Sequence, residues 1–98
     1  MSAAPHFIDD PAYATFREMD SRHGRAKGDA FRAFKALGAR LEEGRDFHCC
    51  DRRVDGERFD LLEASGRLYR GTVNGVLLGP AAQAAIAAMF EGDHSPSA

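Results

Sequence analysis

The side chains with the most reactive chemistry in this sequence stand next to one another, at His48-Cys49-Cys50-Asp51. Thiols and imidazoles are ligands for soft metals, and a thiolate is a nucleophile. The flanking residues predict a β-strand, in which successive side chains point to opposite faces, so His48 and Cys50 share a face that Cys49 does not. No second Cys or His pair stands at zinc-finger spacing. We therefore predict no metal site and no cofactor, with two cysteines that fill space in the interior.

The catalytic alternative at the same cluster is a Cys50 nucleophile with His48 as its base. The register described below places Glu63 opposite His48, where a carboxylate would orient the imidazole. His48 and Glu63 also form an ordinary cross-strand surface pair in such a sheet. Because no further residue completes a catalytic set, we predict no catalytic residues.

A second chemical feature is the positive charge between residues 22 and 40. The net charge of the 98 residues is −2, yet this stretch holds six cations and one carboxylate, Asp29. Cations clustered on a helix and its leading loop form an electrostatic footprint for phosphate. The alternative is a solvated helix face, which the negative net charge and the lack of stacking aromatics on that polar face favour. The candidate nucleic-acid-binding residues are Arg22, Arg25, Lys27, Arg32, Lys35 and Arg40.

The length of the chain fits one domain with a modest core. We expect residues 1–92 to form this domain and residues 93–98 to be a flexible tail. The N-terminus lacks the basic start and the hydrophobic stretch of a secretory signal, and no apolar run is long enough to cross a bilayer. A cytoplasmic location without a membrane partner is therefore expected.

Local signals predict three helices. Asp9-Asp10-Pro11 combines capping carboxylates with a proline suited to the first helical position, so the first helix starts there and runs to about residue 22. The second helix spans about 28–44, with its apolar residues on one side of the helical wheel. Gly79-Pro80 starts a closing, alanine-rich helix over about 80–90.

Three glycine dipeptides divide the region between the second and third helices. Asp55-Gly56, Ser65-Gly66 and Asn74-Gly75 stand about ten residues apart, and such dipeptides are signals for tight hairpins. Their spacing predicts strands over residues 46–54, 57–64, 67–73 and 76–78. The predicted fold class is therefore α+β, with two N-terminal helices, a three- to four-stranded antiparallel meander and a C-terminal Ala-rich helix.

Two-residue turns would fix the register of this meander and sort its side chains by face. The face bearing Phe47, Cys49 and Val76 is expected to pack on the helices. The other face has an apolar centre with a charged surround, and such a face is either covered by another element or presented to a partner. Its predicted partner-binding residues are Phe59, Leu61, Leu68, Arg70, His48 and Arg52.

The stretch from Phe59 to Val73, which carries a Tyr69-Arg70 step after a predicted hairpin turn, resembles the sheet of RelE/ParE-type toxins. The resemblance covers the middle and last thirds of the chain. It implies a ribosome-associated ribonuclease or a gyrase poison that pairs with an antitoxin, with Arg70 as its functional residue. The family's opening strand would fall at 5–8, and its basic residues after the last strand are replaced here by Gly79-Pro80-Ala81.

Three functional hypotheses follow. The first is a small non-enzymatic protein-binding or regulatory module that acts through the mixed sheet face. The second is a RelE/ParE-like toxin or another nucleic-acid-directed protein, acting through Arg70 and the basic stretch. The third is a self-associating subunit whose alanine-rich helix or sheet face forms a two-fold interface.

Overall fold

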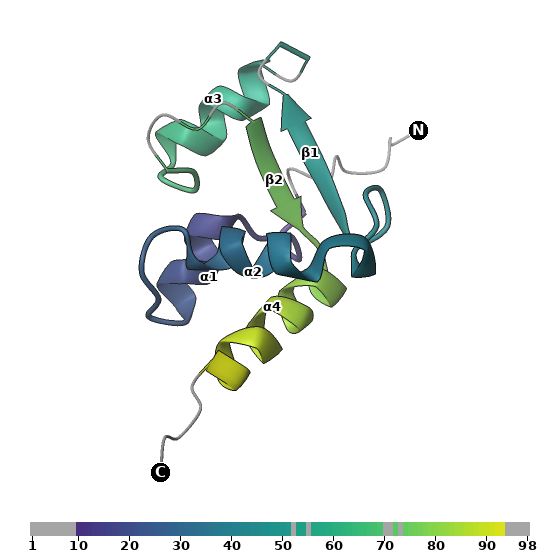
Figure 1. Ribbon diagram of the computed structural model, residues 1–98. Helices are drawn as coiled ribbons and strands as arrows, with labels where there is room; N and C mark the ends of the chain where they lie inside the picture. The colour runs from purple at the N-terminus through teal and green to yellow at the C-terminus, as the bar shows by residue number, and fades with distance from the viewer. Residues whose placement is uncertain (1–9, 52, 55, 70–71, 73, 94–98) are drawn as a thin grey trace.

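The computed structural model describes residues 10–51, 53–54, 56–69, 72 and 74–93, and it has an α+β fold (Figure 1). This confirms the predicted α+β class and the closing Ala-rich helix. The elements, in chain order, are α1 (Phe16–Arg22), α2 (Asp29–Leu37), a 3-10 helix η2 (Gly38–Arg40), β1 (Phe47–Asp51), α3 (Gly56–Ala64), β2 (Asn74–Leu78) and α4 (Pro80–Asp93).

Helix α1 begins later than the Asp-Pro signal predicts. Asp10 closes a turn instead, because its carboxylate Oδ1 accepts from the Ala12 N–H at 2.9 Å and its carbonyl accepts from the Tyr13 N–H at 3.0 Å. Ala14 then pairs in both directions with Leu78 of β2, so the chain is still extended there. The helix starts after Thr15, which forms a capping box with Glu18.

Helix α2 is shorter than predicted, since it ends at Leu37 rather than near residue 44. Gly38 has a φ of 50°, a conformation that an L side chain rarely adopts and that stops the helix. Residues 38–40 continue as η2. Ala30, Ala33 and Leu37 form the buried stripe of α2.

The predicted meander is wrong, because the described sheet has two strands. β1 and β2 pair antiparallel, from Phe47 opposite Leu78 to Asp51 opposite Asn74. The segment predicted as a strand over 57–64 is α3, and none of the described residues of 67–73 belongs to a strand. Asn74-Gly75 is no turn either, since both residues lie within β2 and pair with Asp51 and Cys50.

The Ser65-Gly66 dipeptide ends a helix rather than turning a hairpin. Gly66 has a φ of 78°, and its N–H donates to the Glu63 carbonyl at 3.1 Å while the Arg67 N–H donates to the Leu62 carbonyl at 3.0 Å. These two bonds are the Schellman pattern that closes a helix C-terminus. A glycine with positive φ serves both structures, so the dipeptide alone does not distinguish them.

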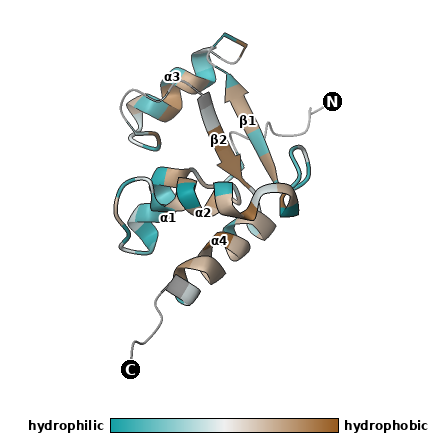
Figure 2. Ribbon diagram, in the orientation of Figure 1, coloured by the Kyte–Doolittle hydropathy of each residue, from teal (hydrophilic) through white to brown (hydrophobic). Residues whose placement is uncertain are grey.

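The two faces of the sheet are covered by different parts of the chain. α3 lies beside the strands, whereas α1, α2 and α4 gather where β2 runs into α4 (Figure 1). The main core is on the face of Leu78 and includes Ala14, Met19, Ala30, Ala33, Leu37, Ala82, Ile86 and Phe90. A second core on the opposite face holds Cys50, Phe59, Leu62, Leu68 and Leu77. Hydrophobic colour is concentrated on β2, while α2 mixes hydrophobic and hydrophilic residues (Figure 2).

Helix α4 extends to Asp93, one residue into the predicted tail, and residues 94–98 lie outside the described residues. The side chains of Ile86 and Phe90 are buried in the main core, and Met89 packs against it half-buried. Within the described part of the chain, no helix combines the length and apolar character needed to span a membrane.

Candidate functional site

Four phenylalanine rings from three elements form a row at the surface, in which each ring contacts the next. Phe31 of α2 meets Phe16 of α1 at 5.5 Å between ring centroids, Phe16 meets Phe34 at 5.2 Å, and Phe34 meets Phe47 of β1 at 4.8 Å, all edge to face. We call these four residues the aromatic strip. Phe31 is 46% exposed, whereas Phe16, Phe34 and Phe47 are half-buried and pack against the edge of the main core, so the strip is most open to solvent at Phe31.

The pattern of α2 explains why the strip stays at the surface. Ala30, Ala33 and Leu37 already fill the stripe that faces the main core. Small alanines bring α2 close to its neighbours, and the two larger rings, Phe31 and Phe34, are left at its margin, three residues apart on one side of the helix. The sequence pattern that could have predicted this site is the pair of aromatic residues, Phe31 and Phe34, next to the alanines that face the core.

The strip continues onto an incompletely covered part of the sheet. Along β1, Phe47 is followed on the same face by Cys49, whose cross-strand neighbour is Val76. Cys49 is exposed and Val76 is half-buried, whereas Cys50, on the opposite face, is completely buried. The two cysteines therefore point to opposite faces, as predicted, but only Cys50 fills space in the interior.

Opposite charges stand at the two ends of the strip. Lys35 is exposed, and its Nζ lies 5.6 Å from the centroid of the Phe31 ring. At the other end, the backbone of Glu43 forms an isolated β-bridge with Phe47, and its side chain forms a hydrogen bond with the thiol of Cys49. The strip therefore has a cationic group, Lys35, at its Phe31 end and an anionic group, Glu43, at its Phe47 end.

The environment of Cys49 disfavours the thiolate form, although the residue is exposed. Burial of the sulfur, followed by the charge and the hydrogen bond of Glu43, raises the pKa of the thiol above its ordinary value. We expect iodoacetamide at pH 8 to alkylate Cys49 several-fold more slowly than it alkylates a free cysteine. The Glu43→Gln variant should react faster, and Cys50 should react only after unfolding. A Cys49 rate equal to that of free cysteine would contradict this assignment.

The predicted partner-binding residues do not share one surface. Phe59 and Leu68 are buried in the second core, and His48 is half-buried with its ring 5.6 Å from that of Tyr13. Leu61 is 68% exposed on the outer side of α3. Arg52 and Arg70 lie outside the described residues.

The cause of this difference is the helix over 56–64. As a strand, the segment would carry Phe59 and Leu61 on the same face; as α3, it places them about 200° apart around the helix axis. α3 covers the face of Cys50 and Leu77 with Phe59 and Leu62. The residue opposite His48 is Leu77 rather than Glu63, so the sheet does not assemble the catalytic alternative.

The predicted nucleic-acid-binding residues make contacts within the chain in several directions. Asp29 pairs with both Arg25, at 3.1 Å, and Arg32, and these partners lower the pKa of its carboxyl group, with the Arg32 hydrogen bond as the largest cause. Arg25 also lies 4.6 Å from the Phe90 ring centroid. The remaining positions are Arg22 with Gln83, Lys27 over the Tyr69 ring, Lys35 over Phe31, and Arg40, exposed in η2.

A buried carboxylate fixes the start of α2 and hence the position of Phe31. Asp20 is 2% exposed and accepts from the N–H groups of Gly28, at 3.0 Å, and Ala30, at 2.7 Å. It also accepts from the Tyr69 hydroxyl at 2.5 Å. Burial, then this hydrogen bond and the Asp20 charge, raise the pKa of Tyr69 to about 12. Gly28, the N-cap, has no side chain to cap α2, so Asp20 performs that function from α1.

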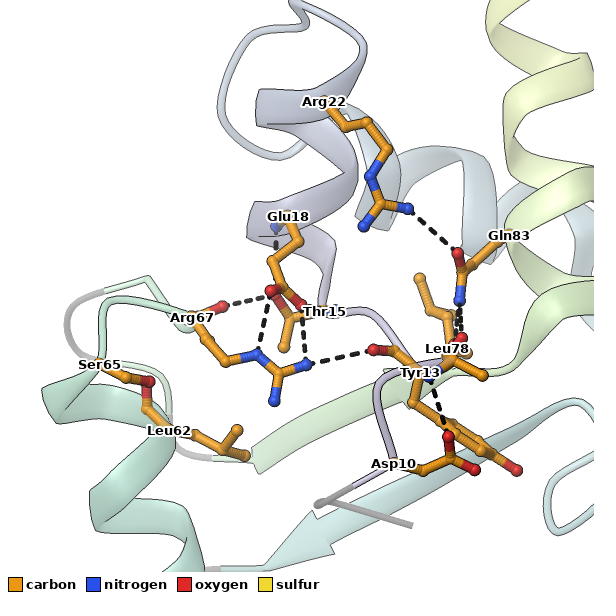
Figure 3. A network of polar contacts seen from close by, with 11 residues as sticks. Asp10, Tyr13, Thr15, Glu18, Arg22, Leu62, Ser65, Arg67, Leu78 and Gln83 are labelled. Carbon is orange, nitrogen blue, oxygen red and sulfur yellow. Dashed lines mark hydrogen bonds and ion pairs between the residues drawn. The ribbon is translucent and has the colours of Figure 1, made fainter.

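A second polar network fastens α1 to the segment after α3 (Figure 3). The Arg67 guanidinium donates twice to Glu18, at 3.0 Å each, and once to the Tyr13 carbonyl at 3.2 Å. Burial alone would raise the pKa of Glu18, but the bonds from Arg67 and from the Thr15 N–H lower it below its usual value. The network holds Phe16, which follows Thr15, in a fixed position within the strip.

Within the described residues, no three His, Cys, Asp or Glu side chains come together as a metal site. The arrangement that the fold does present is an apolar, ring-lined surface with Lys35 at one end and Glu43 at the other. No protein-family model, curated protein or solved structure matches this chain.

Proposed function

We propose that this chain is a small, non-enzymatic protein-binding module that docks its partner on the aromatic strip. The observation that supports the proposal is the 46% exposure of Phe31 at the end of four contacting rings. Contiguous exposed apolar surface usually marks an interaction site, and aromatic residues supply much of the binding energy at protein interfaces.

The strip is held by rigid supports, which favours binding. Asp20 fixes the first turn of α2, and the Thr15–Glu18 capping box fixes the first turn of α1. A surface that is already ordered loses little conformational entropy when a partner arrives. The partner that suits this surface brings its own apolar side chains, flanked by charged groups that complement Lys35 and Glu43.

Leu61 offers the best comparison, because it is the described member of the predicted partner-binding set that is largely exposed. Its exposed fraction, 68%, exceeds that of Phe31, but it stands alone on α3 rather than in a row of contacting rings. A charge placed at either position therefore tests one surface without disturbing the other.

The test compares the tagged wild-type chain with the Phe31→Asp and Leu61→Asp variants in capture from native lysate, measured by mass spectrometry. We expect partners held by the wild type and by Leu61→Asp to be lost about ten-fold or more from Phe31→Asp. Circular dichroism should show that both variants keep the helical content of the wild type. Loss from Leu61→Asp alone would place the interface on α3, and equal capture by all three would overturn the proposal.

A toxin-like or other nucleic-acid-directed protein is the second candidate function. One observation favours it: Lys35 and the open Phe31 ring combine a cation with a stacking surface, which single-stranded nucleic acids use. The pairing of Arg25 and Arg32 with Asp29 counts against a continuous phosphate track. In the same experiment, capture that nuclease treatment or raised salt abolishes would favour this candidate.

A further inference from the structure

The ends of the aromatic strip make it complementary to itself. We propose that its partner is a second copy of this chain, and that two copies form a two-fold dimer with strip facing strip. This inference rests on the proposed function, because it uses the same surface.

The charges at the ends of the strip favour this occupant. In a two-fold interface, residue i of one copy meets residue j of the other, and residue j of the first meets residue i of the second. A two-fold axis that crosses the middle of the strip brings the Phe31 end of one copy over the Phe47 end of the other. Lys35 of each copy then faces Glu43 of the other, so the two attractive pairs form at once.

The apolar part of the strip also suits a second copy. Phe16 and Phe34 stand between the two charged ends, where the rings of the two copies would pack on one another. Beyond Phe47, Cys49 and Val76 add two small apolar side chains. A strip with the same charge at both ends would repel its own copy, so the opposite signs are what make self-association favourable.

The alanine-rich helix is a weaker candidate for the same role. α4 buries its larger residues, Ile86 and Phe90, in the main core. Its exposed positions among 81–88 are alanines, Ala81, Ala84 and Ala88, which offer no large side chain to a partner.

Sedimentation equilibrium of the untagged chain over a range of concentrations tests this inference. We expect a monomer–dimer equilibrium in the wild type and a monomer for Phe31→Asp at the same concentrations. Lys35→Glu and Glu43→Lys should each raise the dissociation constant about ten-fold, because each places like charges together at both ends of the interface. The double variant Lys35→Glu/Glu43→Lys reverses the strip and should restore the wild-type constant.

The control is Glu57→Lys, which makes the same change of charge as Glu43→Lys at an exposed position of α3 and should leave the constant unchanged. A wild-type chain that stays monomeric at the highest concentration would overturn the inference. So would a dimer that responds equally to Glu57→Lys and Glu43→Lys, or a double variant as weak as the single ones. If the chain is monomeric but Phe31-dependent capture of other proteins persists, the proposed function stands and only the second copy is excluded.

Discussion

Replacement of Phe59 by alanine is expected to lower the free energy of unfolding by about 3–5 kcal/mol. Phe59 is completely buried, where it packs with Cys50, Leu62, Leu68 and Leu77 between α3 and the sheet. Its loss leaves a cavity that the two-stranded sheet cannot close by a small shift. A small domain has about 5–15 kcal/mol of stability in total, so the variant should be largely or partly unfolded under mild conditions. Urea unfolding followed by circular dichroism measures the change.

Leu61→Ala is the matched control, since it removes a large apolar side chain two residues away on the same helix. Leu61 is 68% exposed, so this variant should change the free energy of unfolding by no more than about 0.5 kcal/mol. The comparison also distinguishes a helix from a strand, because a strand would carry both residues on one face. Equal losses from the two variants would contradict the structure of α3.

Replacement of Asp20 by alanine is expected to lower the free energy of unfolding by about 3 kcal/mol. Two N–H groups at the start of α2, those of Gly28 and Ala30, lose their acceptor, and the Tyr69 hydroxyl loses its partner. Because Asp20 is 2% exposed, water does not readily replace these bonds. Thermal and urea unfolding of the variant measure the loss.

Tyr69→Phe is the control for this prediction, because it removes only the hydroxyl and leaves both N–H groups with their acceptor. Its expected cost is about 1 kcal/mol near neutral pH.

The raised pKa of Tyr69 also predicts a pH dependence: the unfolded phenol ionises near its ordinary value of 10.0, and the folded one at about 12. Wild-type stability should therefore fall as the pH rises through this window, and Tyr69→Phe should lack that part of the fall. Equal stability of Asp20→Ala and the wild type would contradict the capping role.

Asp20 and Phe59 lie outside the aromatic strip, but they hold in place the helices next to it. Asp20 sets the position of α2, and Phe59 anchors α3 and the chain that returns through Arg67 to α1. Loss of either support should weaken binding through the strip as well as stability. The surface variant Phe31→Asp should weaken binding with a much smaller loss of stability, since its ring is 46% exposed, and this difference separates a docking role from a structural one.

Short sequence patterns were sufficient to predict secondary structure where they are compatible with only one kind of element. The alanine-rich segment after Gly79-Pro80 forms α4, because its composition has high helix propensity and its larger residues recur on one side. Strand geometry also placed Cys49 and Cys50 on opposite faces without knowledge of the partner strand. The start of α1 could also have been predicted from the sequence, since Thr15 and Glu18 have the spacing of a capping box.

Where the same short sequence pattern is compatible with both a helix and a strand, contacts with residues far away in the chain determine which one forms. Ser65-Gly66 suits a hairpin turn and a helix end equally, and the residues over 57–64 alternate well enough for a strand while containing good helix formers. The helix prevails because it buries Phe59 and Leu62 together against Cys50 and Leu77, which a lone third strand would not achieve. Arg67 then completes the arrangement by bonding to Glu18, 49 residues earlier in the chain.

By itself, then, the sequence determined an α+β domain, its alanine-rich closing helix, a basic second helix and two cysteines on opposite faces of a strand. Only the tertiary structure decided that the 57–64 segment covers the sheet as α3 and that four phenylalanines meet at the surface. The reason is physical: helix and strand periods are encoded within a few residues, whereas burial depends on which segments, far apart in the chain, exclude water from each other. The reactive cluster at residues 48–51 belongs to that second category, since contacts with Tyr13, Glu43 and the second core set the environment of its side chains.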